Sequence, residues 1–218
     1  MSDDSAILAT YYRNNILHLF AMPSLIACVF SGNALVRTED IQRLAWRIYP
    51  YIAAELFLRW DEKELPDVVH RVLACLEQHG LVECNAERTE WRRPPPTSAK
   101  AVQLSLLAQA TIQTIERYYL AIEQLIKAGS GQITQAALEE RCQLTAQRMA
   151  LLHGLNSPEF FDRDMFSHFI DLLRGRQVVR NSPSGKLEFD EVLMRVAADA
   201  QFVLSEQLRH SILQVMHA

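Results

Sequence analysis

The residues that could carry out catalysis in this chain of 218 are seven histidines, four cysteines and 26 acidic residues. A histidine followed five positions later by an aspartate can accept a proton from a hydroxyl group, because the carboxylate orients the imidazole. No histidine here has an aspartate at that spacing, and neither a GxSxG nor an HExxH motif occurs. The segment "GSGQIT" at 129–134 lacks the lysine of a phosphate-binding P-loop. The sequence therefore predicts no catalytic residue in this chain.

The histidines and cysteines also lack a pattern that predicts metal binding. His70 and His79 fall on different faces of the helix expected there, and Cys84 belongs to the segment after that helix. The cysteines are isolated, without a CxxC pair, which is typical of buried thiols in a reducing cytosol. The stretch "RWDEKELPD" at 59–67 is expected to be a solvated turn rather than an acidic site. We therefore expect neither a metal nor a cofactor.

The composition is that of a mainly helical globular protein. Hydrophobic residues make up 49% of the chain and charged residues 22%, while only seven glycines and eight prolines occur. Leucine, alanine, glutamine, glutamate and arginine are abundant, and these residues favour helix over strand. The formal net charge of −4 gives no general attraction to nucleic acid or to anionic lipid. Binding of either kind would need a local basic patch.

Two of the expected helices contain a proline. The apolar run at 16–30 would extend roughly 22 Å as a helix, which is less than the hydrocarbon core of about 30 Å. A buried helix, broken or kinked near Pro23, is therefore favoured over an interfacial segment. A second helix, over 38–59, is expected to be capped by Thr38 and kinked or split at Pro50.

A short amphipathic helix and a hairpin complete the first part of the chain, 1–97. The helix is expected to have Pro66 in its first turn and Gly80 at the C′ position, with leucine and valine on one face. A hairpin over 81–93 follows it, and a triple proline then ends this part. The first part is therefore predicted to be a helical subdomain that ends in a β-hairpin.

The second part, 98–218, has a similar order of elements. A long helix is expected from Ser98 to the glycines near 129, because isoleucine and tyrosine recur at intervals of three or four residues. After it we expect two short helices, a longer helix capped by Ser157, a hairpin around 182–185 and a single closing helix from about Asp190. The two parts are expected to pack as one compact unit.

A helix followed by a hairpin occurs twice, at 66–93 and at 159–189. This order is compatible with winged-helix-like units or with a helical domain that carries two simple hairpins. Acidic residues on both helices argue against nucleic-acid binding. The stretch "RTEWRR" is the one basic segment that resembles a wing, and its Arg88, Arg92 and Arg93 form a candidate site for an acidic protein partner.

Four blocks of sequence stand out: "YYRNNILH" at 11–18, "PSLIACVF" at 23–30, "AELFLRWDEKELPDVV" at 54–69 and "AQRMALLHGLNSPEFFD" at 146–162. Together they resemble the carboxy-terminal region of the bacterial membrane-associated glycerol-3-phosphate acyltransferase. The resemblance runs from about Leu8 to the end of the chain and keeps the order and approximate spacing of the blocks.

The resemblance implies a place in phospholipid synthesis. Members of that family transfer an acyl group from acyl carrier protein or coenzyme A to the first-position hydroxyl of glycerol 3-phosphate, at the cytoplasmic face of the bacterial inner membrane. Their catalytic His-x-x-x-x-Asp block and the "FPEG"-type block that binds glycerol phosphate lie upstream of the matched region. This sequence contains neither block, so no catalytic residue is carried over. The resemblance therefore implies a chain that is inactive alone and has a structural or regulatory role.

The same resemblance suggests roles for the segment near the amino terminus. The apolar run at 16–30 is expected to be an interface with the upstream acyltransferase domain or with the adjoining membrane surface. Arg13, Asn14 and Asn15 offer a guanidinium fork and two amides, which suit a contact near the substrate anion or at the interface. Helix capping by the two asparagines is the alternative. For the chain as a whole, the alternative is an independent protein-interaction or winged-helix nucleic-acid-binding module.

Overall fold

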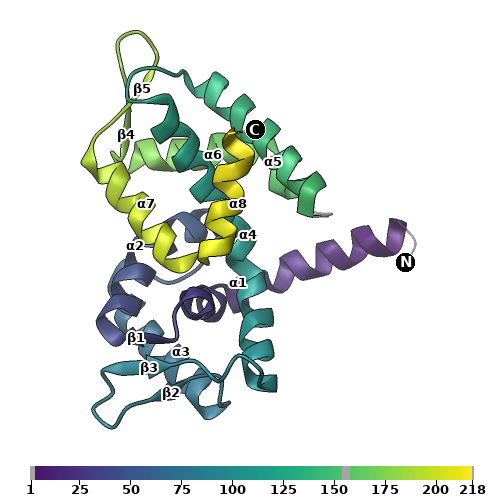
Figure 1. Cartoon of the computed structure of the whole chain (residues 1–218), viewed down its shortest axis with the longest axis vertical. Helices are drawn as coiled ribbons and strands as arrows, with labels where there is room; N and C mark the ends of the chain where they lie inside the picture. Colours follow the sequence, from purple (N-terminus) through teal and green to yellow (C-terminus); the bar gives the residue numbers. More distant parts are fainter. Residues whose placement is uncertain (1–2, 154–157, 218) are drawn as a thin grey trace. The chain divides into compact units, whose positions relative to one another are not determined.

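The computed structural model describes the backbone of residues 3–153 and 158–217, and within these ranges the side chains of 16–152, 160–200 and 202–216. It is mainly helical, with short antiparallel strands, as predicted (Figure 1). Contacts within the chain group it into two compact units, 1–112 and 113–218. The division expected at residue 97, and the packing of both parts as one unit, stay predictions.

The first unit contains helices α1, α2 and α3 and three short strands. The elements are α1 (Asp3–Gly32), β1 (Leu35–Arg37), α2 (Thr38–Leu56), the 3₁₀ turn η1 (Glu62–Glu64), α3 (Leu65–Gln78), β2 (Glu83–Cys84) and β3 (Glu90–Arg92). Helix α4 (Ala99–Ala128) starts in this unit and continues into the second. The predicted hairpin at 81–93 is confirmed by the antiparallel pairing of β2 with β3.

Strand β1 gives the first unit a winged-helix topology. It pairs antiparallel with β3, so the sheet order is β1-β3-β2 and the chain order is helix, strand, helix, helix, hairpin. This strand was not predicted from the sequence, because three residues are too few for an alternating pattern. Its central residue, Val36, lies opposite Trp91, and both side chains are almost fully buried. Pairing with the hairpin therefore defines the strand.

Thr38 joins α2 to the hairpin. Its hydroxyl donates a hydrogen bond to the carbonyl oxygen of Arg88 at 2.9 Å and accepts one from Nε1 of Trp91, also at 2.9 Å. The N-cap of α2 is Arg37, which makes no side-chain capping bond, so the predicted Thr38 cap is wrong. The hydroxyl that could have capped the helix instead satisfies the buried indole.

The two prolines do not break their helices. Pro23 lies inside α1 and Pro50 inside α2, and both helices continue through them, so the alternative of a break is wrong in each case. Both residues lie where neighbouring side chains are buried, and tertiary packing offsets the loss of one backbone hydrogen bond.

The apolar run at 16–30 divides into an exposed and a buried half. Ile16, Leu19 and Phe20 are 51%, 61% and 45% exposed. From Ala21 to Phe30 the side chains are buried, apart from the half-buried Pro23. The expected burial is therefore found for the second half of the run and not for the first.

Helix α3 follows its sequence pattern closely. Leu65, Val69, Leu73 and Leu76 are buried as predicted, and Pro66 lies in the first turn. Gly80 is at C′ with φ of +66°, where a residue without a Cβ avoids strain. The amide of Leu81 donates to the carbonyl of Leu76 at 2.8 Å, and the amide of Gly80 to that of Glu77 at 2.8 Å. This Schellman motif confirms the predicted helix end.

The second unit repeats the order of the first. After α4 come α5 (Gln135–His153), the 3₁₀ turn η2 (Pro158–Phe161), α6 (Arg163–Gly175), β4 (Val179–Asn181), β5 (Leu187–Phe189), α7 (Glu191–Val203) and α8 (Glu206–His217). Thr134 forms a bridge with Lys186, beside the β4-β5 hairpin, as β1 does beside β3. Both units therefore have the winged-helix order, and the repeat is larger than a helix and a hairpin.

Three helix boundaries in the second unit differ from those predicted. The two short helices expected before residue 154 are one helix, α5, and the single closing helix is divided into α7 and α8. Ser157 lies outside the described residues. The longer helix, α6, starts at Arg163, and the side chain of Asp162 caps it by accepting from the amide of Asp164 at 3.0 Å. The hairpin at 182–185 is confirmed, with Gly185 at φ of +76°.

Ser24 connects the buried half of α1 to α4 within the first unit. Its hydroxyl donates to the carbonyl of Ala108 at 3.1 Å and lies 2.8 Å from the hydroxyl of Thr111. We expect Ser24→Ala to lower the free energy of unfolding by about 1–3 kcal/mol, because the buried Thr111 hydroxyl loses a partner. Urea unfolding measures this, with Ser31→Ala as control, since Ser31 is an exposed serine of the same helix. Equal losses in both variants would contradict the prediction.

Glu116 on α4 is a buried carboxyl group in the second unit. It is 8% exposed, and burial raises its pKa to about 7 from an ordinary value of 4.5. The folded state therefore favours the protonated form, and stability falls as the pH rises from about 4.5 to about 7, by up to roughly 3 kcal/mol.

We expect Glu116→Gln to stabilise the protein at pH 8 and to have little effect at pH 4.5, because the neutral amide resembles the protonated acid. Denaturant unfolding at the two pH values measures the difference. Glu140→Gln on α5 is the control, since Glu140 is exposed. A gain for Glu116→Gln that does not grow with pH would show that its carboxyl group titrates normally.

Candidate functional site

The described residues contain no group of three or more histidine, cysteine or acidic side chains that could hold a metal ion. Within the same residues, no helix is long and apolar enough to span a bilayer. The candidate sites are the two groups of residues predicted from the sequence, at 13–15 and in the first hairpin, and two cavities in the first unit.

Arg13, Asn14 and Asn15 lie in α1, and their side chains are outside those that the structure describes. Because α1 begins at Asp3, these residues belong to the interior of the helix. The alternative that the two asparagines cap a helix is therefore wrong. Their contact with a substrate anion or a partner stays a prediction.

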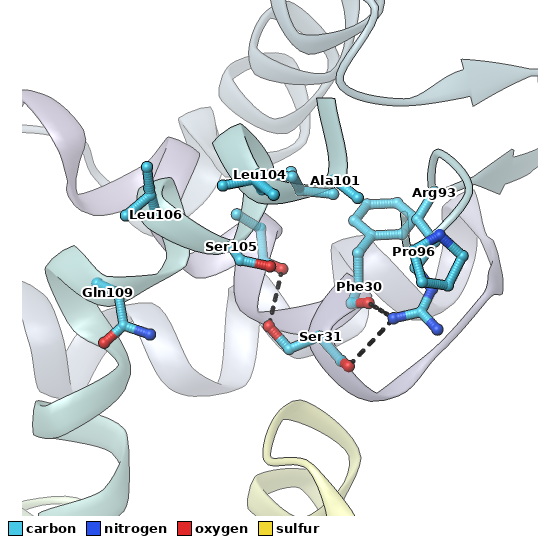
Figure 2. A pocket seen from close by; sticks show the side chains of 11 residues that line it. Phe30, Ser31, Arg93, Pro96, Ala101, Leu104, Ser105, Leu106 and Gln109 are labelled. Carbon is cyan, nitrogen blue, oxygen red and sulfur yellow. Dashed lines mark hydrogen bonds between the residues drawn. The ribbon is translucent and has the colours of Figure 1, made fainter. Parts of the chain in front are cut away.

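The arginines of the first hairpin do not form one free cluster. The guanidinium of Arg88 pairs with Glu77 at 2.9 Å and lies 5.2 Å from the ring centroid of Trp91. The bond to Glu77 raises the pKa of Arg88 above its ordinary value. Arg93 donates from Nη1 to the carbonyls of Phe30 and Ser31, each at 3.4 Å (Figure 2). Arg92 is exposed on β3, the central strand of the sheet, between Leu35 of β1 and Glu83 of β2.

The cavity beside Arg93 has a volume of about 310 Å³. Figure 2 shows Phe30 and Pro96 facing Ala101 and Leu104 across it, with the Arg93 guanidinium turned toward the end of α1. Because Arg93 binds the last carbonyl groups of α1, its charge offsets the negative end of the helix dipole. The lining includes no base next to its serines, so the geometry indicates a structural role.

A second cavity, of about 380 Å³, lies against α3, and we call it the α3 cavity. It combines an apolar wall with two guanidinium groups. Its lining residues are Pro23, Arg59, Trp60, Val68, Arg71, Val72, Cys75 and Leu76. The segment 59–67, which was expected to be only a solvated turn, thus contributes two of these residues.

The sequence contains a weak signal for the α3 cavity. Val68, Val72 and Leu76 recur at intervals of four, which places them on one strip of α3 beside the main buried face. Arg59 and Trp60 come from the preceding loop, and periodicity cannot show that a loop folds back over this strip. The sequence therefore does not predict the cavity, although its periodicity does indicate the apolar strip.

Comparison with known proteins identifies the family. The family model described as "Glycerol-3-phosphate acyltransferase C-terminal region" matches residues 1–182. The glycerol-3-phosphate acyltransferases of Pseudomonas paraeruginosa and of Pseudomonas aeruginosa strain UCBPP-PA14 are each 44% identical to this chain over 216 residues. That of Ectopseudomonas mendocina is 43% identical over the same length.

These alignments cover 99% of this chain but 26% of each relative, so the chain spans about a quarter of the length of the relatives it matches. No solved structure matches the chain. The family match covers most of the sequence and agrees with the resemblance of the four blocks. The chain therefore belongs to the family of the glycerol-3-phosphate acyltransferase C-terminal region.

Proposed function

We propose that this chain is the carboxy-terminal part of a glycerol-3-phosphate 1-O-acyltransferase and that its own role is structural or regulatory. The full enzyme would transfer an acyl group from acyl carrier protein or coenzyme A to glycerol 3-phosphate, peripherally bound at the cytoplasmic face of the bacterial inner membrane. The family match supports the assignment, and the absence of a His-x-x-x-x-Asp block from this sequence supports the non-catalytic role.

The observation that carries the structural role is an exposed apolar face on α1. Ile16, Leu19 and Phe20 recur at i, i+3 and i+4, so they share one face of the helix. All three are exposed, whereas the continuation of the same helix is buried in the first unit. An apolar helix face of this kind usually marks a contact with another surface.

The occupant that we propose for this face is the acyltransferase domain of the full enzyme. About three-quarters of each relative lies outside the matched region, so there is ample additional chain to cover the helix. Arg13 precedes Ile16 by one helical turn and would lie at the edge of the same contact. The membrane surface is the second candidate, because apolar helix faces also bind at the lipid interface.

The hairpin arginines are proposed contacts for an acidic partner such as acyl carrier protein. Arg92 is exposed, whereas Arg88 and Arg93 also make the contacts described above within the first unit. An acidic partner would therefore meet Arg92 first and would compete with Glu77 for Arg88.

The isolated chain is expected to have no acyltransferase activity, because it lacks the histidine and carboxylate pair that would activate the acceptor hydroxyl. Transfer of a radiolabelled acyl group from coenzyme A to glycerol 3-phosphate measures this. The full-length Pseudomonas aeruginosa relative, in the same assay, is the positive control. Turnover by the chain above that of a heat-inactivated sample would overturn the proposed role.

The exposed face of α1 is tested by binding in trans. The tagged chain is co-expressed with the remaining part of the Pseudomonas aeruginosa relative, and the amount of that part that co-purifies is measured. We expect Leu19→Glu to reduce co-purification by about tenfold or more, because a buried unpaired carboxylate is costly. Leu151→Glu is the matched control, since Leu151 is an exposed leucine on α5.

Equal co-purification of both variants with the wild type would contradict this docking surface. Loss of binding to lipid vesicles in Leu19→Glu, without loss of co-purification, would instead assign the face to the membrane.

A further inference from the structure

The wall of the α3 cavity is suited to an apolar chain. Val72 is half-buried and is the open part of this wall, whereas Val68 and Leu76, which are 2% and 4% exposed, form its buried base on the same strip of α3. Pro23 of α1 adds a further apolar surface. A volume of about 380 Å³ is within the range of roughly 300–1,000 Å³ that is typical of small-molecule sites. The cavity can therefore hold a short hydrocarbon segment.

Two cations line the same cavity. Arg59 and Arg71 are both exposed, and the guanidinium carbon of Arg59 lies 5.3 Å from the ring centroid of Trp60. Among the described side chains, neither arginine forms an ion pair with a carboxylate. Asp67 precedes Arg71 by one turn of α3 but does not line the cavity. An anionic group beside the apolar wall would therefore meet two available guanidinium groups.

The loop that carries Arg59 and Trp60 is held in place. The buried hydroxyl of Tyr49 on α2 donates to the carbonyl of Trp60 and accepts from its amide, both at 3.1 Å. The amide of Leu58 donates to the carbonyl of Ala53 at 3.1 Å and so closes the end of α2. Because these bonds lie within the protein itself, they hold the loop in position, and a loop held in this way lowers the entropy cost of binding.

From this arrangement we propose that the α3 cavity binds a phosphate monoester that carries one apolar chain. The chain lies against Val68, Val72 and Leu76, and the phosphate lies between Arg59 and Arg71 at the mouth. A phosphate monoester carries up to two negative charges near neutral pH, which match two guanidinium groups better than a single carboxylate does.

This chemistry would also connect the cavity to regulation of the enzyme. If the proposed function holds, on which this step rests, the product of the full enzyme is itself a phosphate monoester with one acyl chain. The α3 cavity would then sense the product away from the catalytic residues. Binding by the isolated chain is measured without any activity assay, so its failure is distinguishable from failure of the proposed function.

Cys75 provides a direct test, because it is exposed and lines the α3 cavity. In a Cys84→Ser background, where the remaining thiols of Cys28 and Cys142 are buried, the rate of Cys75 alkylation by N-ethylmaleimide is followed by mass spectrometry. Octyl phosphate, below its micelle concentration, is expected to slow alkylation several-fold. Octyl glucoside has the apolar chain but no phosphate, and inorganic phosphate has the anion but no chain. Each is expected to slow alkylation much less.

Arginine variants locate the anion. Arg59→Gln and Arg71→Gln should each raise the octyl phosphate concentration for half-maximal protection by about tenfold, because a charge-assisted contact is lost. Arg92→Gln, an exposed arginine outside the cavity, should leave that concentration unchanged. Circular dichroism melting confirms that the variants fold.

Three results would overturn the proposal. Equal protection by octyl glucoside would show that the cavity takes apolar chains without regard to charge. Unchanged protection in both cavity arginine variants would place the phosphate elsewhere. Protection only by vesicles that contain phosphatidic acid, and not by monomeric octyl phosphate, would show contact with a membrane surface instead of a cavity ligand.

Discussion

Burial of the second half of α1 is the constraint on which the first unit depends. From Ala21 to Phe30 this helix packs against α2, α3 and β1, and its Ser24 hydroxyl is bonded within the core to α4. A buried hydroxyl needs a partner, and the rotation of α1 brings Ser24 to Thr111. Once that rotation is set, Pro23 faces the α3 cavity. One helix thus contributes both to the core and to the candidate ligand site.

The winged-helix topology does not by itself establish nucleic-acid binding. In nucleic-acid-binding members of this topology the second helix of the pair approaches phosphates, which requires a basic surface. Here the exposed charges are mixed in sign: α3 exposes Asp67 as well as Arg71, and α6 exposes Asp164 and Asp171 as well as Arg163. In the first wing, Arg88 is paired with Glu77 instead of being free for phosphate. The topology also presents helix faces and loops on a compact scaffold, and a fold of this kind does not by itself imply a function.

The arginines of the first unit have different partners, and their charges therefore have different roles. Arg93 stabilises the end of α1, and Arg88 holds the hairpin turn against α3. Arg59 and Arg71 have no carboxylate partner among the described side chains and lie beside an apolar wall. A count of basic residues in the sequence selects the hairpin first, because three arginines are close together there. Whether an arginine is available to a ligand depends on its partners within the protein, and those partners are distant in sequence.

The sequence by itself determined the family and most of the helices. The Pro66 start and Gly80 end of α3 follow from local backbone chemistry, and the apolar periodicity of 38–59 and 98–128 needs no knowledge of neighbours. Only the tertiary structure decided which half of 16–30 is buried. The residues on both sides of Ala21 are equally apolar, so exposure depends on whether other elements reach them.

The tertiary structure alone also decided that Leu35–Arg37 is a strand, that the Thr38 hydroxyl bonds the hairpin instead of capping α2, and that a loop forms the α3 cavity. In each case the partner is separated by tens of residues along the chain, or lies across a turn whose direction local pattern does not specify. Periodicity records which face of an element is apolar. It does not record what covers that face, because this is settled by long-range packing.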